Sequence, residues 1–114
     1  MTDPNSKPSK QRQASEELIA ITKAYEMVRE LTVRVDKFPR GHKFVLGDRI
    51  LANAYDVLDL LIEAKYTRQK VSLLDRANIT LEKLRFQFRL AHDEQIISTH
   101  QYQVIAGPLM KWVG

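Results

Sequence analysis

Residues 43–66, KFVLGDRILANAYDVLDLLIEAKY, carry apolar side chains at steps of three and four, the period of one face of an α-helix. The residues in this apolar stripe are Leu46, Ile50, Ala54, Val57, Leu61 and Ala64. Four acidic residues face the other way: Asp48, Asp56, Asp59 and Glu63. The segment therefore predicts an amphipathic helix that buries one side against the rest of the chain.

A helix of the same period is expected before this segment. Ser15, followed by two glutamates, has the chemistry of a helix N-cap, and Pro39 disfavours helical geometry at the residue before it. The expected core-facing stripe between them consists of Leu18, Ile21, Tyr25, Val28, Thr32 and Val35.

Two further helices are expected after it. The first runs from about residue 69 to residue 92, with the stripe Leu74, Ala77, Leu81, Leu84, Phe88 and Ala91. Ser98 and Gln101 fit a capping box that opens the second, which Gly107-Pro108 should kink or split. Its expected stripe is Tyr102, Ile105, Leu109 and Trp112.

These segments predict an all-α fold. The chain has 114 residues, which suits one hydrophobic core, and no strand-like alternation of any length interrupts the helical pattern. We therefore expect residues 15–114 to form an antiparallel up-down-up-down four-helix bundle. Residues 1–14 are polar, hold two prolines, and are expected to form a flexible tail.

Composition excludes several classes of function. No cysteine is present, which removes disulfides, thiol catalysis and cysteine-ligated metals, and three histidines make an all-protein metal site unlikely on composition. We expect no metal and no cofactor. The apolar runs are far shorter than the roughly 20 residues of a membrane span, and the start lacks a signal peptide's apolar stretch. A soluble, cytoplasmic protein is the resulting expectation.

Positive charge is concentrated in one stretch of the chain. The formal net charge is +4, and residues 65–89 hold seven basic side chains against Asp75 and Glu82. The basic set is Lys65, Arg68, Lys70, Arg76, Lys83, Arg85 and Arg89. Phosphate neutralisation would make such a stretch a polyanion-binding surface, whereas the plainer alternative is a solvated helix face.

The third helix has a second apolar side. Ile79, Phe86 and Leu90 fall roughly opposite its core stripe. They form either a small exposed patch or a contact between subunits. On the same helix, Arg85 and Arg89 lie near the edge of the core side, whereas Arg76 and Lys83 lie on the outer face. One helix cannot join these four cations in one stripe, so only neighbouring subunits would gather them.

Catalytic motifs are absent from the sequence. It has no glycine-rich phosphate loop and no nucleophile elbow. Arg85 and His92, seven residues apart, loosely resemble the arginine–histidine signature of helical HEPN ribonucleases, in which histidine performs acid–base chemistry. A histidine at the end of a helix is the alternative, and we expect no enzymatic activity.

Four motifs occur in order and at matching spacing: Phe38-Pro39-Arg40, Leu46-Gly47-Asp48-Arg49-Ile50, Leu61-Ile62-Glu63-Ala64 and Leu84-Arg85-Phe86-Gln87-Phe88-Arg89-Leu90-Ala91. Over about residues 18–112 the chain resembles a four-helix-bundle family with two branches. One branch holds the accessory variability determinant proteins of diversity-generating retroelements. The other holds proteins encoded in intervening sequences of ribosomal RNA genes, oligomeric scaffolds without an assigned role.

The resemblance to the first branch implies a non-enzymatic homopentamer with a basic surface. Such a protein binds RNA or an RNA–DNA hybrid and associates with a reverse transcriptase. By the matching motifs, Arg85 and Arg89 would contact phosphate and Arg40 would contact phosphate or cap a helix. A pentamer would also bury Ile79, Phe86 and Leu90. A scaffold that bridges proteins without binding nucleic acid remains the alternative from another class.

Overall fold

The computed structural model describes residues 10–109, all of whose regular elements are helical. In chain order they are α1 (Lys10–Asp36), α2 (Arg40–His42), the π-helix η1 (Lys43–Gly47), α3 (Asp48–Tyr66), α4 (Lys70–Asp93), α5 (Thr99–Val104) and the π-helix η2 (Ile105–Leu109). The described residues contain no strand, so the expected all-α class is confirmed.

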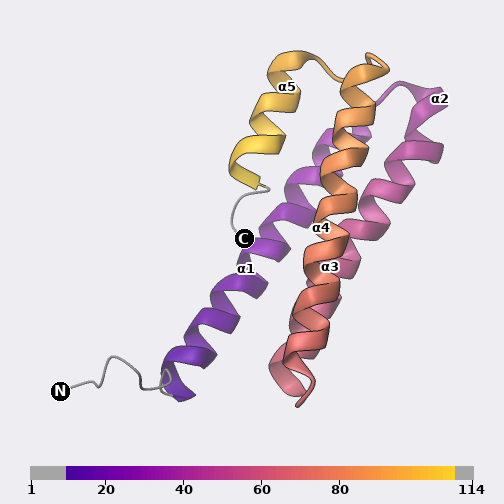
Figure 1. Cartoon of the computed structure of the whole chain (residues 1–114). Coiled ribbons are helices and arrows are strands. Elements are labelled where there is room, and N and C mark those ends of the chain that lie inside the picture. Colours follow the sequence, from indigo (N-terminus) through magenta and orange to yellow (C-terminus); the bar gives the residue numbers. More distant parts are fainter. Residues whose placement is uncertain (1–9, 110–114) are drawn as a thin grey trace.

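The helix α3 lies at the centre, packed against α1 on one side and α4 on the other. Successive long helices run in alternating directions in Figure 1, and α5 returns alongside the C-terminal part of α4. This order is compatible with the expected up-down-up-down bundle. The fourth helix is short, however, and accompanies only one end of an elongated molecule.

The core follows the predicted stripes of α3 and α4 closely. All six residues of the stripe predicted over residues 43–66 are buried, Leu46 in η1 and the other five in α3, and five of the six predicted on α4 are buried as well. The largest fully buried side chains come from four helical segments: Phe88, Met27, Leu31, Ile50, Leu81, Leu84, Ile105 and Val57. Each contributes about 1.5–3 kcal/mol through removal from water.

The start predicted for the first helix is wrong. Its predicted stripe is right at Val28 and Val35, which are buried, and wrong at Leu18, Tyr25 and Thr32, which are exposed. α1 begins at Lys10, so Ser15 lies inside the helix and is not its N-cap. The side that carries Leu18 and Tyr25 is exposed, because α1 packs through Ala24, Met27 and Leu31 instead. The remainder of the predicted tail, residues 1–9, lies outside the described range.

The predicted stripe of α4 is wrong at one leucine. Leu73 is buried there, whereas Leu74 is 42% exposed. Leu74 lines a small hollow with Ala20 and Leu61 at the end of the molecule that α5 does not reach.

The capping box of the fourth helix is confirmed. Ser98 Oγ accepts the backbone N–H of Gln101 at 3.1 Å, and the Gln101 side chain accepts the backbone N–H of Ser98 at 2.8 Å. Beyond it, residues 105–109 form η2, a local change of helix type at the Gly107-Pro108 step where we expected a kink. Ile105 is buried as predicted, while Trp112 lies outside the described residues.

Candidate functional site

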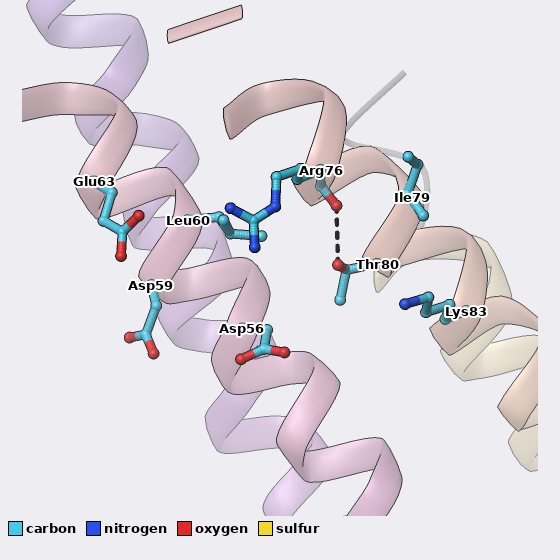
Figure 2. Close-up of a pocket in the computed structure, with 8 residues that line it drawn as sticks. All are labelled: Asp56, Asp59, Leu60, Glu63, Arg76, Ile79, Thr80 and Lys83. Carbon is cyan, nitrogen blue, oxygen red and sulfur yellow. Dashed lines mark hydrogen bonds between the residues drawn. The ribbon is translucent and has the colours of Figure 1, made fainter. Parts of the chain in front are cut away.

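A groove between α3 and α4 holds two rows of charged side chains (Figure 2). Asp56, Asp59 and Glu63 form the acidic row on α3, at spacings of three and four that keep them on one side of the helix. Arg76 and Lys83 form the basic row on α4. The groove has a volume of about 340 Å³.

The floor of this groove is built from Leu60 and Thr80. Leu60 is buried, and Thr80 Oγ1 donates a hydrogen bond of 2.9 Å to the carbonyl oxygen of Arg76 one turn earlier. Figure 2 shows the Arg76 guanidinium reaching from α4 toward α3. Ile79 stands on the rim between Arg76 and Lys83.

The two rows form no direct ion pair with each other among the described residues. Over residues 10–109, no ion pair within 4.0 Å joins a member of the acidic row to a member of the basic row. All five side chains belong to exposed residues. Three carboxylates against two cations leave the groove with a formal excess of negative charge. Arg76 and Lys83 were predicted to face phosphate, and here they lie beside carboxylates.

Arg85 and Arg89 lie on a different side of α4. The α3-facing side is marked by Gln87, whose Oε1 accepts a hydrogen bond of 3.1 Å from Asn53 of α3. The other side is marked by His92, seven residues after Arg85, which stacks on Tyr102 of α5. The structure therefore separates Arg85 and Arg89 from Arg76 and Lys83, as the helical period predicted.

Both of these arginines have carboxylate neighbours on α4. Arg85 forms an ion pair with Glu82, and Arg89 Nε lies 3.9 Å from Asp93 Oδ2. Such i,i+3 and i,i+4 pairs on an exposed surface are weak, on the order of 0.3–0.5 kcal/mol, so a phosphate can compete for the same guanidinium groups.

Lys70 has a structural role that the sequence did not suggest. Its ammonium group donates hydrogen bonds to Glu17 Oε1 at 2.8 Å, the carbonyl oxygen of Ala64 at 2.8 Å and that of Lys65 at 3.2 Å. It thereby satisfies C-terminal carbonyls of α3 and ties α1 to the α3–α4 turn. All three donors of the ammonium are engaged, which makes Lys70 the weakest member of the predicted phosphate-facing set.

The remaining predicted cations lie at opposite ends of the molecule. Arg40 begins α2, whereas Lys65 and Arg68 flank the α3–α4 turn at the far end (Figure 1). The Lys65 ammonium lies 5.8 Å from the centre of the Tyr66 ring. One chain thus distributes the eight predicted residues over separate places, and a single basic patch is not formed within it.

Ile79, Phe86 and Leu90 are 57%, 65% and 49% exposed, so their side chains are available to a partner. Leu90 also lines an apolar hollow of about 310 Å³ together with Val45 and Ile96. This exposure is what a subunit contact requires, and the contact itself stays a prediction.

His92 takes part in the junction between α4 and α5. Its Nε2 lies 2.9 Å from Thr99 Oγ1, and its ring stacks on Tyr102 with 5.1 Å between ring centres. These contacts are those of a histidine that joins two helices. They give the ribonuclease hypothesis for Arg85 and His92 no support.

Residues 10–109 contain no group of three or more histidine, aspartate or glutamate side chains placed to hold a metal ion. None of the helices in this range combines the length and the apolar character needed to cross a membrane.

A family model described as bAvd-like matches residues 18–114. The matched range includes all four sequence motifs. No curated protein and no solved structure matches the chain.

Proposed function

The chain belongs to the bAvd-like family, and on that premise we propose that it is a non-enzymatic accessory protein of a diversity-generating retroelement. It binds RNA or an RNA–DNA hybrid through phosphate contacts and associates with the reverse transcriptase of the element. The family match over residues 18–114 is the observation that carries this proposal.

Electrostatics supports the nucleic-acid part of the proposal. The net charge of +4 and the surplus of basic groups in residues 65–89 favour a polyanion. Arg85 and Arg89 are the proposed principal phosphate contacts, because their ion pairs with Glu82 and Asp93 on α4 are of the weak i,i+3 and i,i+4 kind that a phosphate can replace. Arg40, Lys65 and Arg68 add contacts at the two ends of the molecule. Such contacts position a backbone and carry little sequence information.

The functional form is a homo-oligomer, with the pentamer that the family resemblance implies as the proposed state. Ile79, Phe86 and Leu90 form its subunit contact. Because one chain leaves its cations in separate places, repetition of Arg85 and Arg89 around an assembly is what produces an extended basic surface.

The test is RNA binding as a function of salt. The double variant Arg85→Ala/Arg89→Ala should lose two phosphate contacts, and the slope of log K against log salt should become shallower by about 1.4–1.8. The matched control is Lys23→Ala/Arg29→Ala, which removes the same charge from exposed positions on α1. Equal losses in both variants, or no RNA binding by the wild type at low salt, would contradict the proposal.

Association with the reverse transcriptase is tested separately. A tagged chain co-expressed with the polymerase of its own element should recover that polymerase after nuclease treatment. Recovery that disappears with the nucleic acid would show that RNA alone joins the two proteins.

A further inference from the structure

We propose that the groove between α3 and α4 is a contact surface for a second copy of this chain. The acidic row of one copy, Asp56, Asp59 and Glu63, pairs there with the basic row of the next, Arg76 and Lys83. The inference rests on the assembly part of the proposed function and assigns it a chemistry.

The acidic row brings like charges close together on α3. Asp56 and Asp59, and Asp59 and Glu63, are like charges one helical turn apart, an arrangement that disfavours an isolated helix surface. Across residues 10–109, no ion pair within 4.0 Å links this row to the opposite one. A facing row of cations from another molecule relieves the repulsion.

The relative position of the two rows also favours this contact. The two rows line one groove, so they lie at the same height along two neighbouring helices. A rotation about an axis parallel to the helices preserves that height. It brings the basic row of one copy level with the acidic row of the next, both in a two-fold pair and in a closed ring. A two-fold axis perpendicular to the helices would instead place the acidic row of one copy against the acidic row of the other. Charge repulsion therefore disfavours that relative orientation of the two copies.

An exposed apolar residue lies between the two cations of the basic row. Ile79 is 57% exposed and shares the groove with Arg76 and Lys83. By the helical period, Phe86 and Leu90 continue along the same outer part of α4. Exposed ion pairs add little stability individually, so these apolar side chains supply most of the association and the charged rows fix its register.

The arrangement assigns Arg76 and Lys83 a role distinct from phosphate binding. In the assembled protein they face carboxylates, whereas Arg85 and Arg89 lie on the other side of α4. Substitutions in the first set should therefore change the mass of the particle, whereas substitutions in the second should lower its affinity for RNA at unchanged mass.

The test uses charge reversal and mixing in the full chain. Arg76→Glu/Lys83→Glu makes the groove uniformly acidic, and Asp56→Lys/Asp59→Lys makes it predominantly basic. Each variant alone should give smaller particles than the wild type in light scattering at about physiological salt. An equimolar mixture of the two should regain larger particles, because their faces are complementary again.

The control is Lys23→Glu/Arg29→Glu, which makes the same change of charge on exposed positions of α1 and should leave the mass unchanged. If a reversed variant does not fold, as judged by far-UV circular dichroism, Arg76→Gln/Lys83→Gln takes its place. It should weaken self-association at least several-fold in sedimentation and reduce its salt dependence.

Three results would overturn the inference: variants that keep the wild-type mass, a mixture that stays small, or a wild type that is monomeric at all concentrations. The first two results leave the nucleic-acid proposal to its own test on Arg85→Ala/Arg89→Ala, whereas a monomeric wild type would also contradict the assembly part of the proposed function. Conversely, the wild type could fail to bind RNA while the mixed variants form larger particles. That outcome would support this contact and contradict the nucleic-acid proposal.

Discussion

At the scale of single residues, Gly47 is the described glycine at which a side chain would have no room. A Cβ built on this residue would lie 2.6 Å from Val35 Cγ1. Val35 is buried at 2% exposure, and a β-branched side chain has few rotamers into which it can move. Gly47 therefore allows the start of α3 to sit directly against the end of α1.

Gly47→Ala is predicted to destabilise the protein by up to about 2 kcal/mol, because overpacking costs about 1–3 kcal/mol and the gain in helix propensity offsets about 1 kcal/mol. Gly41→Ala is the control, since a Cβ there meets nothing within 4 Å. Urea unfolding at a fixed protein concentration measures both. A Gly47→Ala protein as stable as Gly41→Ala would refute the steric explanation.

A second residue-scale contact joins Asp36 at the end of α1 to Lys43 of η1. Lys43 Nζ donates a hydrogen bond of 2.7 Å to Asp36 Oδ1. The hydrogen bond and the charge of Lys43 hold the pKa of Asp36 below its ordinary value of 3.8. Because the pKa is lowered by folding, the pair stabilises the protein above about pH 3.8, and this contribution is lost as the pH falls through the lowered pKa.

Lys43→Gln is predicted to return the pKa of Asp36 to about 3.8 and to weaken the acid dependence of stability in that range. A carboxyl titration followed by NMR measures the pKa directly. Lys37→Gln, one residue after Asp36 in sequence but without the hydrogen bond, is the control. An unchanged pKa in Lys43→Gln would show that the pair does not persist in solution.

At the scale of elements, the stability of α5 depends on its N-cap residue Ser98, because this helix has only six residues. Ser98→Ala removes an N-cap hydrogen bond and should cost about 1 kcal/mol of unfolding free energy. Ser15→Ala is the informative control: Ser15 lies inside α1, so alanine should be neutral or slightly stabilising there. Chemical denaturation compares them. A larger loss of unfolding free energy in Ser15→Ala than in Ser98→Ala would contradict the placement of Ser15 inside α1.

The elements also show what periodicity can and cannot predict. The α3 stripe was predicted completely, because its apolar residues occupy one arc and its acids the opposite one. The apolar arc of α1 is wide enough for two stripes, and the sequence cannot choose between them. The choice came from the packing of Met27 and Leu31, which leaves Leu18 and Tyr25 outside.

At the scale of the whole molecule, the exposed side of α4 has the clearest consequence for mass. Phe86→Glu places a charge at a position that is 65% exposed in one chain and buried in the proposed assembly. The variant should form smaller particles in light scattering while keeping its helical content. Val33→Glu, at a 54% exposed position on α1, should not change the mass. An unchanged mass for Phe86→Glu would remove the subunit contact proposed for this side.

The candidate site could be predicted only in part at this scale. The separation of Arg76 and Lys83 from Arg85 and Arg89 follows from the period of one helix. That Asp56 and its neighbours face Arg76 across a groove depends on how two helices are packed, which no single-helix pattern contains. The contact of Lys70 with Glu17 is another such case, since the two residues are far apart in sequence.

Because α5 lies alongside only one end of the molecule (Figure 1), we expect the two ends to differ in local stability. Where α5 lies beside α4, four helical segments cover the core. Near the α3–α4 turn the described helices in contact are α1, α3 and α4, and Leu74 is 42% exposed. Local opening there exposes little additional apolar surface and so requires less free energy. Backbone amides near Leu73 and Leu74 should exchange with deuterium before those near Phe88. Lys65 and Arg68 therefore lie in the part of the protein that is expected to open locally at the lower free energy.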